Sequence, residues 1–391
     1  MKQFDQILDH FYSDTWDFYT DDEEQFTRAV THMAESAEWI PDVTSKVLRI
    51  EAMDGPLEGL TNAGRYNIRD EVIRDTGERT MLVVRNGLQF DCVRNTAMPS
   101  LFSTAKISGS ALGRLSPYNL SQVLNLCLEV AKGNTLLLRR GEKVSAFLSD
   151  SKGGYVVMNQ NELYDIFMNG LEKFGTADFI RGDVSHDLTH CIVELPDSKE
   201  RLCEKYNAMI AASGRKVDLI PAVRFCTSDT GASSALVQAL FRRSGSSVYF
   251  PINQPLKTKH EASGNKPCIE KFGESVKMLH SAFEDTEETI RQMAATTIQY
   301  PLNALQLIAN KVDIPQKYAR AAYEDLQRYL GGDGVCSMHD IYYSMTLCID
   351  EAAKQGRTNA AKVEDMVSRI LVLAWKDYDL PGQATGWMNA A

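Results

Sequence analysis

The polar corner at residues 227–231 comes closest to a catalytic motif in this chain. The sequence Asp229-Thr230-Gly231 matches the catalytic motif of a retroviral-type aspartic protease. In such a protease, two Asp carboxylates share a proton and activate water. That site requires apolar residues directly before the aspartate, whereas two hydroxyl residues precede Asp229 here. The same residues also suit a turn in which the side chains of Ser228 and Thr230 form hydrogen bonds with the nearby backbone and Gly231 takes a positive φ. The sequence therefore favours a structural turn over a protease site.

The histidines and glycines give weaker signals. His186 and His190 would lie on one side of a strand, but no cysteine pair accompanies them, so we expect structural histidines rather than a metal site. His280 and Glu284 lie one helical turn apart, which is ordinary for a helix surface. Neither glycine-rich nucleotide motif, GxxxxGKS/T or GxGxxG, occurs, and the nearest glycine-rich piece, 109–114, is expected to be a turn. No cofactor and no metal are predicted.

The eight cysteines are scattered, without a CxxC pair or a paired Cys/His spacing. This usage indicates free, buried thiols in a reducing compartment rather than disulfides or zinc ligands. No window approaches the about 18 consecutive apolar residues of a membrane span, and the N-terminus lacks the basic and apolar regions of a secretory signal. We therefore expect a cytoplasmic protein that does not associate with membranes.

The net charge of −10 is placed unevenly along the chain. Residues 1–59 hold 14 acidic and 4 basic residues, which accounts for the whole excess of negative charge. A run of like charges is usually a solvated surface, so a solubilising helical face is the favoured interpretation. The alternative is an acidic arm that covers a basic surface or mimics a polyanion.

Basic residues gather in two regions and give the strongest functional signal. Residues 60–145 hold 12 basic and 7 acidic residues, and residues 215–277 hold 10 and 5. Clusters of Lys and Arg on one face, with exposed aromatic rings nearby, are what binding to a nucleic-acid backbone requires. The predicted nucleic-acid-binding residues are Arg139, Arg140, Lys143, Arg242, Arg243, Lys257, Lys259 and His260. An earlier group consists of Arg65, Arg69, Arg74, Arg79, Arg85 and Arg94. The aromatic residues near the basic groups are Phe90, Phe147, Tyr155, Phe241, Tyr249 and Phe250, although most aromatic residues in strands belong to the core.

Strands and helices must position these residues, and their patterns change along the chain. Ser116 and Pro117 mark a helix start, and apolar residues three and four apart continue the helix to Gly133. Residues 135–148 are predicted to form a hairpin, because two apolar runs flank a basic turn. The remaining predicted helices are 2–12, 22–39, 160–174, 197–212, 267–295, 297–311, 315–330, 338–354 and 360–376, and further strands are predicted within 46–94, 188–195 and 223–260.

The order of these elements predicts an α+β fold, with a mixed, mainly antiparallel sheet and helices followed by a helical C-terminal subdomain. Four parts are expected along the chain. They are an acidic helical N-terminal arm (1–45), a mixed α/β sheet domain (46–265), a helical subdomain (266–380) and a tail (381–391).

Four pieces of the sequence together resemble the phage/plasmid-like protein family, a family of domains of unknown function found on mobile elements. The pieces are LLLRRGEKVSAFLSD followed by MNQNELYDIF, then VRFCTSDTGASSALVQALF, LKTKHEASGNKPCIEKF and SMHDIYYSMTLCIDEA. The resemblance covers roughly residues 95–380 by pattern and leaves the acidic N-terminal region uncovered. It implies a phage or plasmid origin and a mixed sheet with a helical C-terminal part, and it supplies no catalytic residues.

Three functions are compatible with these signals. The first is a phage or plasmid protein that binds nucleic acid, preferentially single-stranded DNA, without catalysis, in replication, recombination or strand annealing. The second is a protein-interaction module that inhibits or redirects a host or defence complex, with the acidic arm as its surface. The third is a hydrolase built on Asp229. Annealing proteins often assemble into homo-oligomers, but the sequence identifies no interface between copies.

Overall fold

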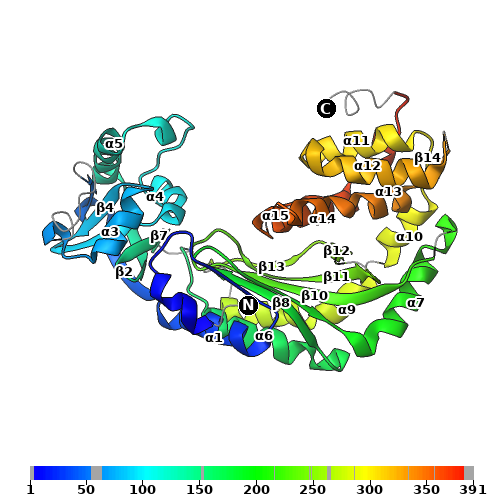
Figure 1. Cartoon of the computed structure of the whole chain (residues 1–391), viewed down its shortest axis with the longest axis horizontal. Helices are drawn as coiled ribbons and strands as arrows, with labels where there is room; N and C mark the ends of the chain where they lie inside the picture. The colour runs from blue at the N-terminus through cyan, green and yellow to red at the C-terminus, as the bar shows by residue number, and fades with distance from the viewer. Residues whose placement is uncertain are drawn as a thin grey trace.

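The chain forms a U-shaped molecule in which two lobes rise from the ends of a large central sheet (Figure 1). This computed structural model describes the chain except residues 1–3, 54–63, 151–153, 215, 246, 248, 262–265, 286, 333, 356 and 383–391. A small α/β lobe stands at one end of the sheet, and a helical lobe stands over the other end. The predicted α+β class is confirmed.

The central sheet is antiparallel and has seven strands. Its order is β1-β8-β9-β10-β11-β12, and the short strand β13 also pairs with β11. Alternating apolar side chains and the turns between the strands explain why these segments pair as neighbouring hairpins. The strands are β1 (Asp17–Thr20), β8 (Asp178–Ser185), β9 (Thr189–Glu194), β10 (Leu219–Thr227), β11 (Ala235–Arg243), β12 (Tyr249–Pro251) and β13 (Leu256–Thr258).

The two faces of this sheet differ in chemistry. One face is apolar and packs on helices that lie beneath it in Figure 1, with Phe225 against Phe167 and Phe272. The opposite face carries polar residues, including Arg224 and Gln238 at neighbouring positions of β10 and β11. The helices of the apolar side are α1 (Glu23–Glu35), α6 (Gln160–Leu171), α7 (Lys199–Met209), α8 (Cys268–Lys277) and α9 (Leu279–Asp285).

The small lobe contains a second, mixed sheet of six strands in the order β2-β6-β7-β5-β4-β3. Strands β5 and β7 are parallel, and the other neighbours are antiparallel. The strands are β2 (Glu38–Thr44), β3 (Leu48–Ala52), β4 (Leu82–Asn86), β5 (Gln89–Val93), β6 (Asn134–Arg140) and β7 (Lys143–Ser149). Two helices, α4 (Met98–Thr104) and α5 (Pro117–Val130), cover one face, and α3 (Asp70–Gly77) covers the other.

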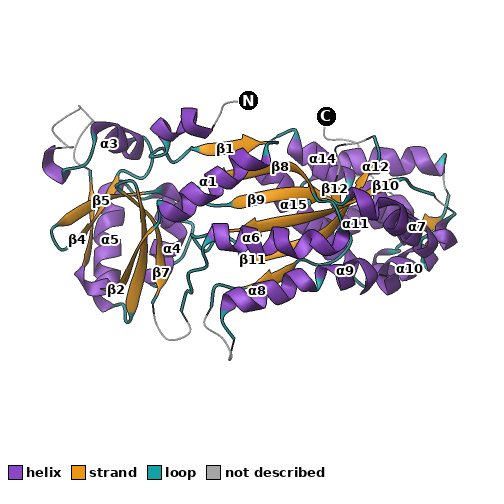
Figure 2. Ribbon diagram, turned by 90° about the horizontal axis from the view of Figure 1, so that it is seen from below, coloured by secondary structure: helices purple, strands orange, loops and turns teal. Residues whose placement is uncertain are grey.

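The helical lobe packs against the polar side of the central sheet, where Arg224 of β10 pairs with Glu364. Figure 2, seen from below, shows the helices of the apolar side, α1, α6, α8 and α9, in front of the sheet. A capping box at Ser337 and Asp340 begins α13, and Gly331, with φ 63°, ends α12 in the left-handed conformation that glycine favours. The elements are α10 (Glu287–Ala295), β14 (Thr297–Ile298), α11 (Pro301–Lys311), α12 (Gln316–Leu330), β15 (Cys336–Ser337), α13 (Met338–Met345), α14 (Leu347–Ala353) and α15 (Arg357–Arg369). None of the described helices is both long enough and apolar enough to cross a membrane.

The N-terminal residues differ from the predicted acidic helical arm. Strand β1 forms an edge of the central sheet, and β2 forms an edge of the small-lobe sheet. Helix α1, which lies between them in the sequence, packs on the core of the central sheet. The apolar residues of this region explain the difference, because Phe18 and Phe26 are buried in the central core. The predicted helix 22–39 ends at Glu35, and Pro41 lies in the edge strand β2.

Three further predictions need adjustment. The single sheet domain predicted for 46–265 contains two separate sheets. The helix predicted at 267–295 is divided into α8, α9 and α10. The predicted tail at 381–391 lies almost wholly outside the described residues.

Candidate functional site

The hairpin β6–β7 joins the small lobe to the central sheet through a buried ion pair. Arg140 is fully buried, and its Nη2 donates to the carboxylate of Asp229 and, at 3.1 Å, to the carbonyl of Met33. Trp39 of β2, Tyr155 and His260 continue this junction as a stack of three rings, with centroids 5.9 and 4.8 Å apart. The hairpin predicted at 135–148 is present, but Arg140 faces the interior of the molecule.

The corner at residues 227–231 is the turn that the sequence favoured. Ser228 Oγ accepts hydrogen bonds from the backbone of Thr230 and Ala232, both at 3.2 Å, and Gly231 has φ 79°. Asp229 is 4% exposed and serves as the counter-ion of Arg140. Its carboxylate therefore has a structural partner in the same chain.

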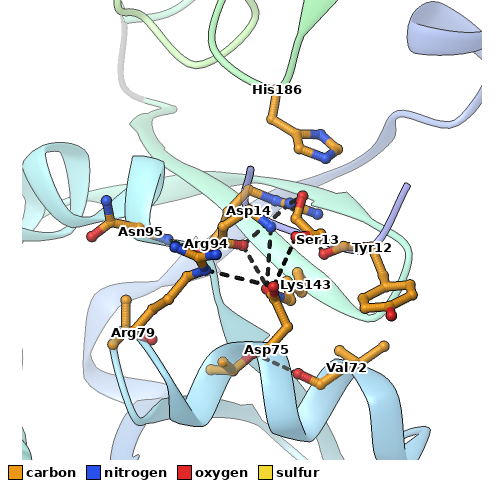
Figure 3. Close-up of polar contacts among 12 residues, drawn as sticks. Tyr12, Ser13, Asp14, Val72, Asp75, Arg79, Arg94, Asn95, Lys143 and His186 are labelled. Carbon is orange, nitrogen blue, oxygen red and sulfur yellow. Dashed lines mark hydrogen bonds and ion pairs between the residues drawn. The ribbon is translucent and has the colours of Figure 1, made fainter. Parts of the chain in front are cut away.

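Four charged side chains form a second buried cluster beside the hairpin (Figure 3). Lys143 Nζ donates to Asp14 at 2.8 Å and to Asp75 at 2.5 Å. Arg94 Nη1 donates to Asp14 at 3.3 Å, and Asp14 also accepts from the backbone of Asn95 at 2.7 Å. The cluster ties the N-terminal segment and α3 to the sheet of the small lobe. Part of the acidic N-terminal region thus neutralises buried cations.

The protonation of this cluster follows from burial and hydrogen bonding. Burial by itself raises the pKa of Asp75, but the ammonium of Lys143 and the hydroxyl of Ser13 outweigh it, so the pKa lies below its usual value. Burial lowers the pKa of Arg94 to about 10, although Asp14 opposes that shift. Both groups therefore remain charged near neutral pH.

Of the two arginines predicted at the end of β11, Arg243 contacts the helical lobe and Arg242 stays within the central sheet. Arg243 donates to the carbonyl of Tyr343 and, at 2.7 Å, to Thr346 Oγ1, and its guanidinium carbon lies 3.5 Å from the centre of the Tyr343 ring. Arg242 pairs with Glu194 on the neighbouring sheet surface. Both arginines therefore have internal partners that a phosphate would have to displace.

The other predicted residues are divided between the surface and the interior. Lys257 and Lys259 are exposed, at 49% and 71% of the side chain, with Asp365 and Glu261 at 3.6 and 3.7 Å. His260 is buried, and burial lowers its pKa. Arg139 is partly exposed and pairs with Asp91 and Glu38, each at 2.7 Å.

The structure does not bring the eight predicted residues onto one face. Arg140 contacts the corner that precedes β11, whereas Arg242 and Arg243 end that strand. Because β11 has nine residues, the two groups lie roughly 27 Å apart. Arg140, Lys143 and His260 are also buried, so the structure corrects the prediction for these three residues, whose side chains do not lie on the surface.

A different group of arginines lies on the open edge of the small lobe. Arg49 on β3 stands directly opposite Arg85 on β4, and both belong to the face on which α3 packs. Glu51 lies 3.2 Å from Arg65 Nη2 and 3.9 Å from Arg85 Nε. We call Arg49, Arg65, Arg85 and Glu51 the arginine edge.

Aromatic rings accompany the arginine edge. Phe90 on β5 is the cross-strand neighbour of Arg85, and its ring centroid lies 5.4 Å from that of Tyr66. The guanidinium of Arg65 lies 5.1 Å from the Tyr66 centroid. The side chains of Arg65 and Arg85 are each 46% exposed. Sequence reasoning placed Arg65, Arg85 and Phe90 in one region but missed Arg49, because Arg49 lies in the acidic N-terminal stretch.

The two histidines considered as metal ligands are separated. His186 donates from Nε2 to the carbonyl of Phe11 at 2.8 Å and lies between the rings of Phe11 and Trp16. His190 lines a cavity of about 590 Å³ between the central sheet and α14–α15, with its Nδ1 3.7 Å from Asp183. Among the described residues, no group of three or more His, Cys, Asp or Glu side chains is arranged to hold a metal ion.

Comparison of the chain with protein-family models, curated proteins and solved structures found no match. The resemblance to the phage/plasmid-like protein family therefore stays a prediction.

Proposed function

We propose that the protein binds single-stranded nucleic acid, without catalysis, along the arginine edge of its small lobe. This proposal keeps the predicted function and moves its site away from the hairpin and the end of β11. Its main support is that the half-exposed guanidinium groups of Arg65 and Arg85 share one carboxylate, Glu51, while Arg49 stands directly opposite Arg85. The proposed setting is the cytoplasm of a host cell, in replication, recombination or strand annealing of a phage or plasmid.

The charge balance of the arginine edge suits a phosphate backbone. Arg49, Arg65 and Arg85 place three positive charges on a short stretch of strand surface, and Glu51 lies among them. Phosphates bind such positions mainly by electrostatic attraction and release of counter-ions, which makes affinity depend strongly on salt. Phe90, partly exposed beside Arg85, offers a ring on which a base of a single strand can stack, whereas Tyr66 is buried behind it.

The main chain of this edge is less suited to binding a peptide strand. The side-chain amide of Asn125 on α5 accepts from the backbone N–H of Ile50 and donates to its carbonyl, both at 2.8 Å. A β-strand partner would need those groups free, because strand addition depends on main-chain hydrogen bonds. Side-chain contacts to phosphates leave these bonds intact.

The alternative function, a protein-interaction module that uses the acidic N-terminal region, gains less support. Asp14 is engaged by Lys143 and Arg94, and Phe18 and Phe26 are buried. Removal of residues 1–59 would delete three strands and α1, so loss of binding by that truncation would report unfolding rather than a lost surface.

A binding titration with neutralised arginines tests the proposal. The variant Arg49→Gln/Arg85→Gln removes two charges, and Lys257→Gln/Lys259→Gln removes two exposed charges elsewhere as a matched control. Each phosphate contact contributes about 0.7 to the slope of log affinity against log salt concentration. The loss of two contacts therefore corresponds to about 60-fold weaker binding near 50 mM salt. We expect that loss, measured by fluorescence anisotropy with a labelled single-stranded oligonucleotide, for the arginine-edge variant alone.

Two results would overturn the proposal. If the wild-type chain binds neither single-stranded DNA nor single-stranded RNA at low salt, the function is wrong. If both double variants lose affinity equally, the arginine edge is not the interface and binding follows overall charge. Circular dichroism of each variant establishes that the fold is retained.

A further inference from the structure

The cavity beside His190 lies between the central sheet and the helices α14 and α15. The strands β1, β8 and β9 form one wall, and the helical lobe, which stands over the sheet in Figure 1, forms the other. Its volume of about 590 Å³ falls within the range of about 300–1,000 Å³ that small-molecule sites occupy. The cavity therefore has room for a small organic ligand.

Three aspartates line the sheet side of this cavity. Asp17 on the edge strand β1 stands directly opposite Ser185 on β8, and Asp183 lies two positions before Ser185, on the same face of that strand. Asp187 follows in the turn between β8 and β9. Among the residues that the structure describes, Asp17 has no ion-pair partner. The carboxylates come from separate backbone positions, so their charges are spread along the wall.

The other charged side chains of the cavity already have partners. Lys354 Nζ lies 2.5 Å from Glu351, and Glu364 is paired with Arg224. The guanidinium of Arg181 lies over the tyrosine ring of β12, 5.3 Å from its centroid. The wall thus carries negative charge that a cationic ligand would neutralise.

His190 adds an unsatisfied polar atom to this wall. It stands opposite Asp183 on the neighbouring strand, is 8% exposed and lines the cavity. Its Nδ1 lies 3.7 Å from the carboxylate of Asp183, whereas Nε2 has no hydrogen-bond partner within the described parts of the chain. Buried polar atoms in folded proteins are nearly always hydrogen-bonded. With the proton on Nδ1, toward the carboxylate, Nε2 is an acceptor that an N–H donor in the cavity would satisfy.

We propose that this cavity binds a small aliphatic diamine, a molecule with two ammonium groups on an apolar chain. One ammonium group pairs with Asp183 and donates to Nε2 of His190, and the second is held by the neighbouring carboxylates. The methylene chain packs on the apolar part of the wall, which includes Leu188 and Ala360.

The distribution of the carboxylates favours a diamine over a metal ion. A metal ion requires several ligands that converge on one point. No three His, Cys, Asp or Glu side chains of the described residues do so. Two separated positive charges match carboxylates that are spread along a wall. The site belongs to the central sheet, so it is independent of the nucleic-acid binding proposed for the small lobe.

Titration calorimetry of the full-length chain with putrescine tests the proposal. We expect saturable binding with a dissociation constant of about 1 mM or lower, and no binding of butanediol, which has the same chain without charge. Asp17→Asn and Asp183→Asn should each weaken binding about tenfold, because each removes a charge-assisted hydrogen bond. Asp377→Asn, which changes an exposed carboxylate outside the cavity, should bind as the wild-type chain does.

Nuclear magnetic resonance of the histidine ring nitrogens tests the predicted contact directly. The signal of His190, assigned by its loss in His190→Gln, should shift when putrescine is added and stay unchanged with butanediol. Circular dichroism of each variant establishes that the fold is retained, and Asp17, at the sheet edge, provides a substitution that does not touch the core.

Three results would overturn the proposal. The first is a wild-type chain that does not bind putrescine up to about 10 mM. The second is an equal loss of affinity in Asp17→Asn and Asp377→Asn, which would show that putrescine follows overall charge. The third is binding of magnesium that displaces putrescine and depends on Asp183, which would assign the carboxylates to an inorganic cation.

Discussion

Lys143 offers the sharpest test of the buried charge cluster. Its ammonium is fully buried and bonded to two carboxylates, those of Asp14 and Asp75. The substitution Lys143→Met keeps most of the volume of the side chain but removes the charge. Both carboxylates then remain buried without their shared cation.

The expected loss of stability follows from the contacts that remain. Removal of one partner of a buried ion pair typically costs about 3–5 kcal/mol. Asp14 would keep Arg94 at 3.3 Å, and Asp75 would keep the hydroxyl of Ser13 at 2.8 Å. We therefore expect a loss near the lower end, about 3 kcal/mol, measured by urea unfolding.

A matched surface pair and a second substitution make this prediction specific. Arg320 pairs with Glu324 on an exposed part of α12, so Arg320→Met should cost less than about 0.5 kcal/mol. In Lys143→Met, adding Asp75→Asn removes one unpaired carboxylate and should recover about 1–2 kcal/mol. If Lys143→Met destabilises the chain no more than Arg320→Met does, the role assigned to the cluster is wrong.

The wild-type chain and the Lys143→Met variant should also differ in how their stability depends on pH. In the wild-type chain the pKa of Asp75 is lowered, so its contribution to stability is present above the unfolded pKa and is lost as the pH falls through the lower folded value. Without Lys143, only the hydrogen bonds from Ser13 and the backbone of Asp14 and the nearby Arg79 oppose burial, so the pKa of Asp75 rises above its wild-type value. The difference in unfolding free energy between the two proteins should therefore shrink as the pH falls from 7 to 4.

Two further changes test the packing of the N-terminal region. A Cβ on Gly182 of β8 would lie 2.1 Å from Phe26 Cδ2, so Gly182→Ala should cost about 1–3 kcal/mol in urea unfolding, whereas Gly113→Ala, with nothing within 4 Å, should be nearly neutral. Burial lowers the pKa of His186 well below its usual value, and three neighbouring cations lower it further. Because the unfolded chain binds that proton below about pH 6.5, stability should fall on acidification, and His186→Phe should reduce the slope by about 1.4 kcal/mol per pH unit. An unchanged slope in His186→Phe would refute the conclusion that burial lowers the pKa of His186 in the folded chain.

Local signals predicted the elements that depend on neighbouring residues. Ser116 caps α5 by accepting from the backbone of Asn119 at 3.3 Å, as the Ser-Pro start indicated. The corner at Ser228 and Gly231 forms because hydroxyls and glycine satisfy a turn within a few residues. The α+β class follows from the same patterns, because each element type has its own periodicity.

Partners distant in the sequence could not be predicted in this way. Strand β1 pairs with β8, and β5 pairs in parallel with β7, so the division into two sheets depends on contacts that no local pattern encodes. The counter-ion of Arg140, Asp229, is 89 positions away in the sequence. A count of basic residues therefore overestimated the charge available at the surface of the hairpin.

The arginine edge differs from the two buried cations of the hairpin β6–β7. Arg140 and Lys143 each face a carboxylate, whereas Arg49 and Arg85 face each other across neighbouring strands. Like charges directly opposite in a sheet are destabilising; among the residues that the structure describes, Glu51 lies 3.9 Å from Arg85, and Arg49 donates to the carbonyls of Lys46 and Leu48 at 3.0 and 3.2 Å rather than to a carboxylate. A local rule that is broken without full internal compensation indicates a functional surface. An anionic ligand would supply the missing compensation, so binding of single-stranded nucleic acid should also raise the stability of the small lobe.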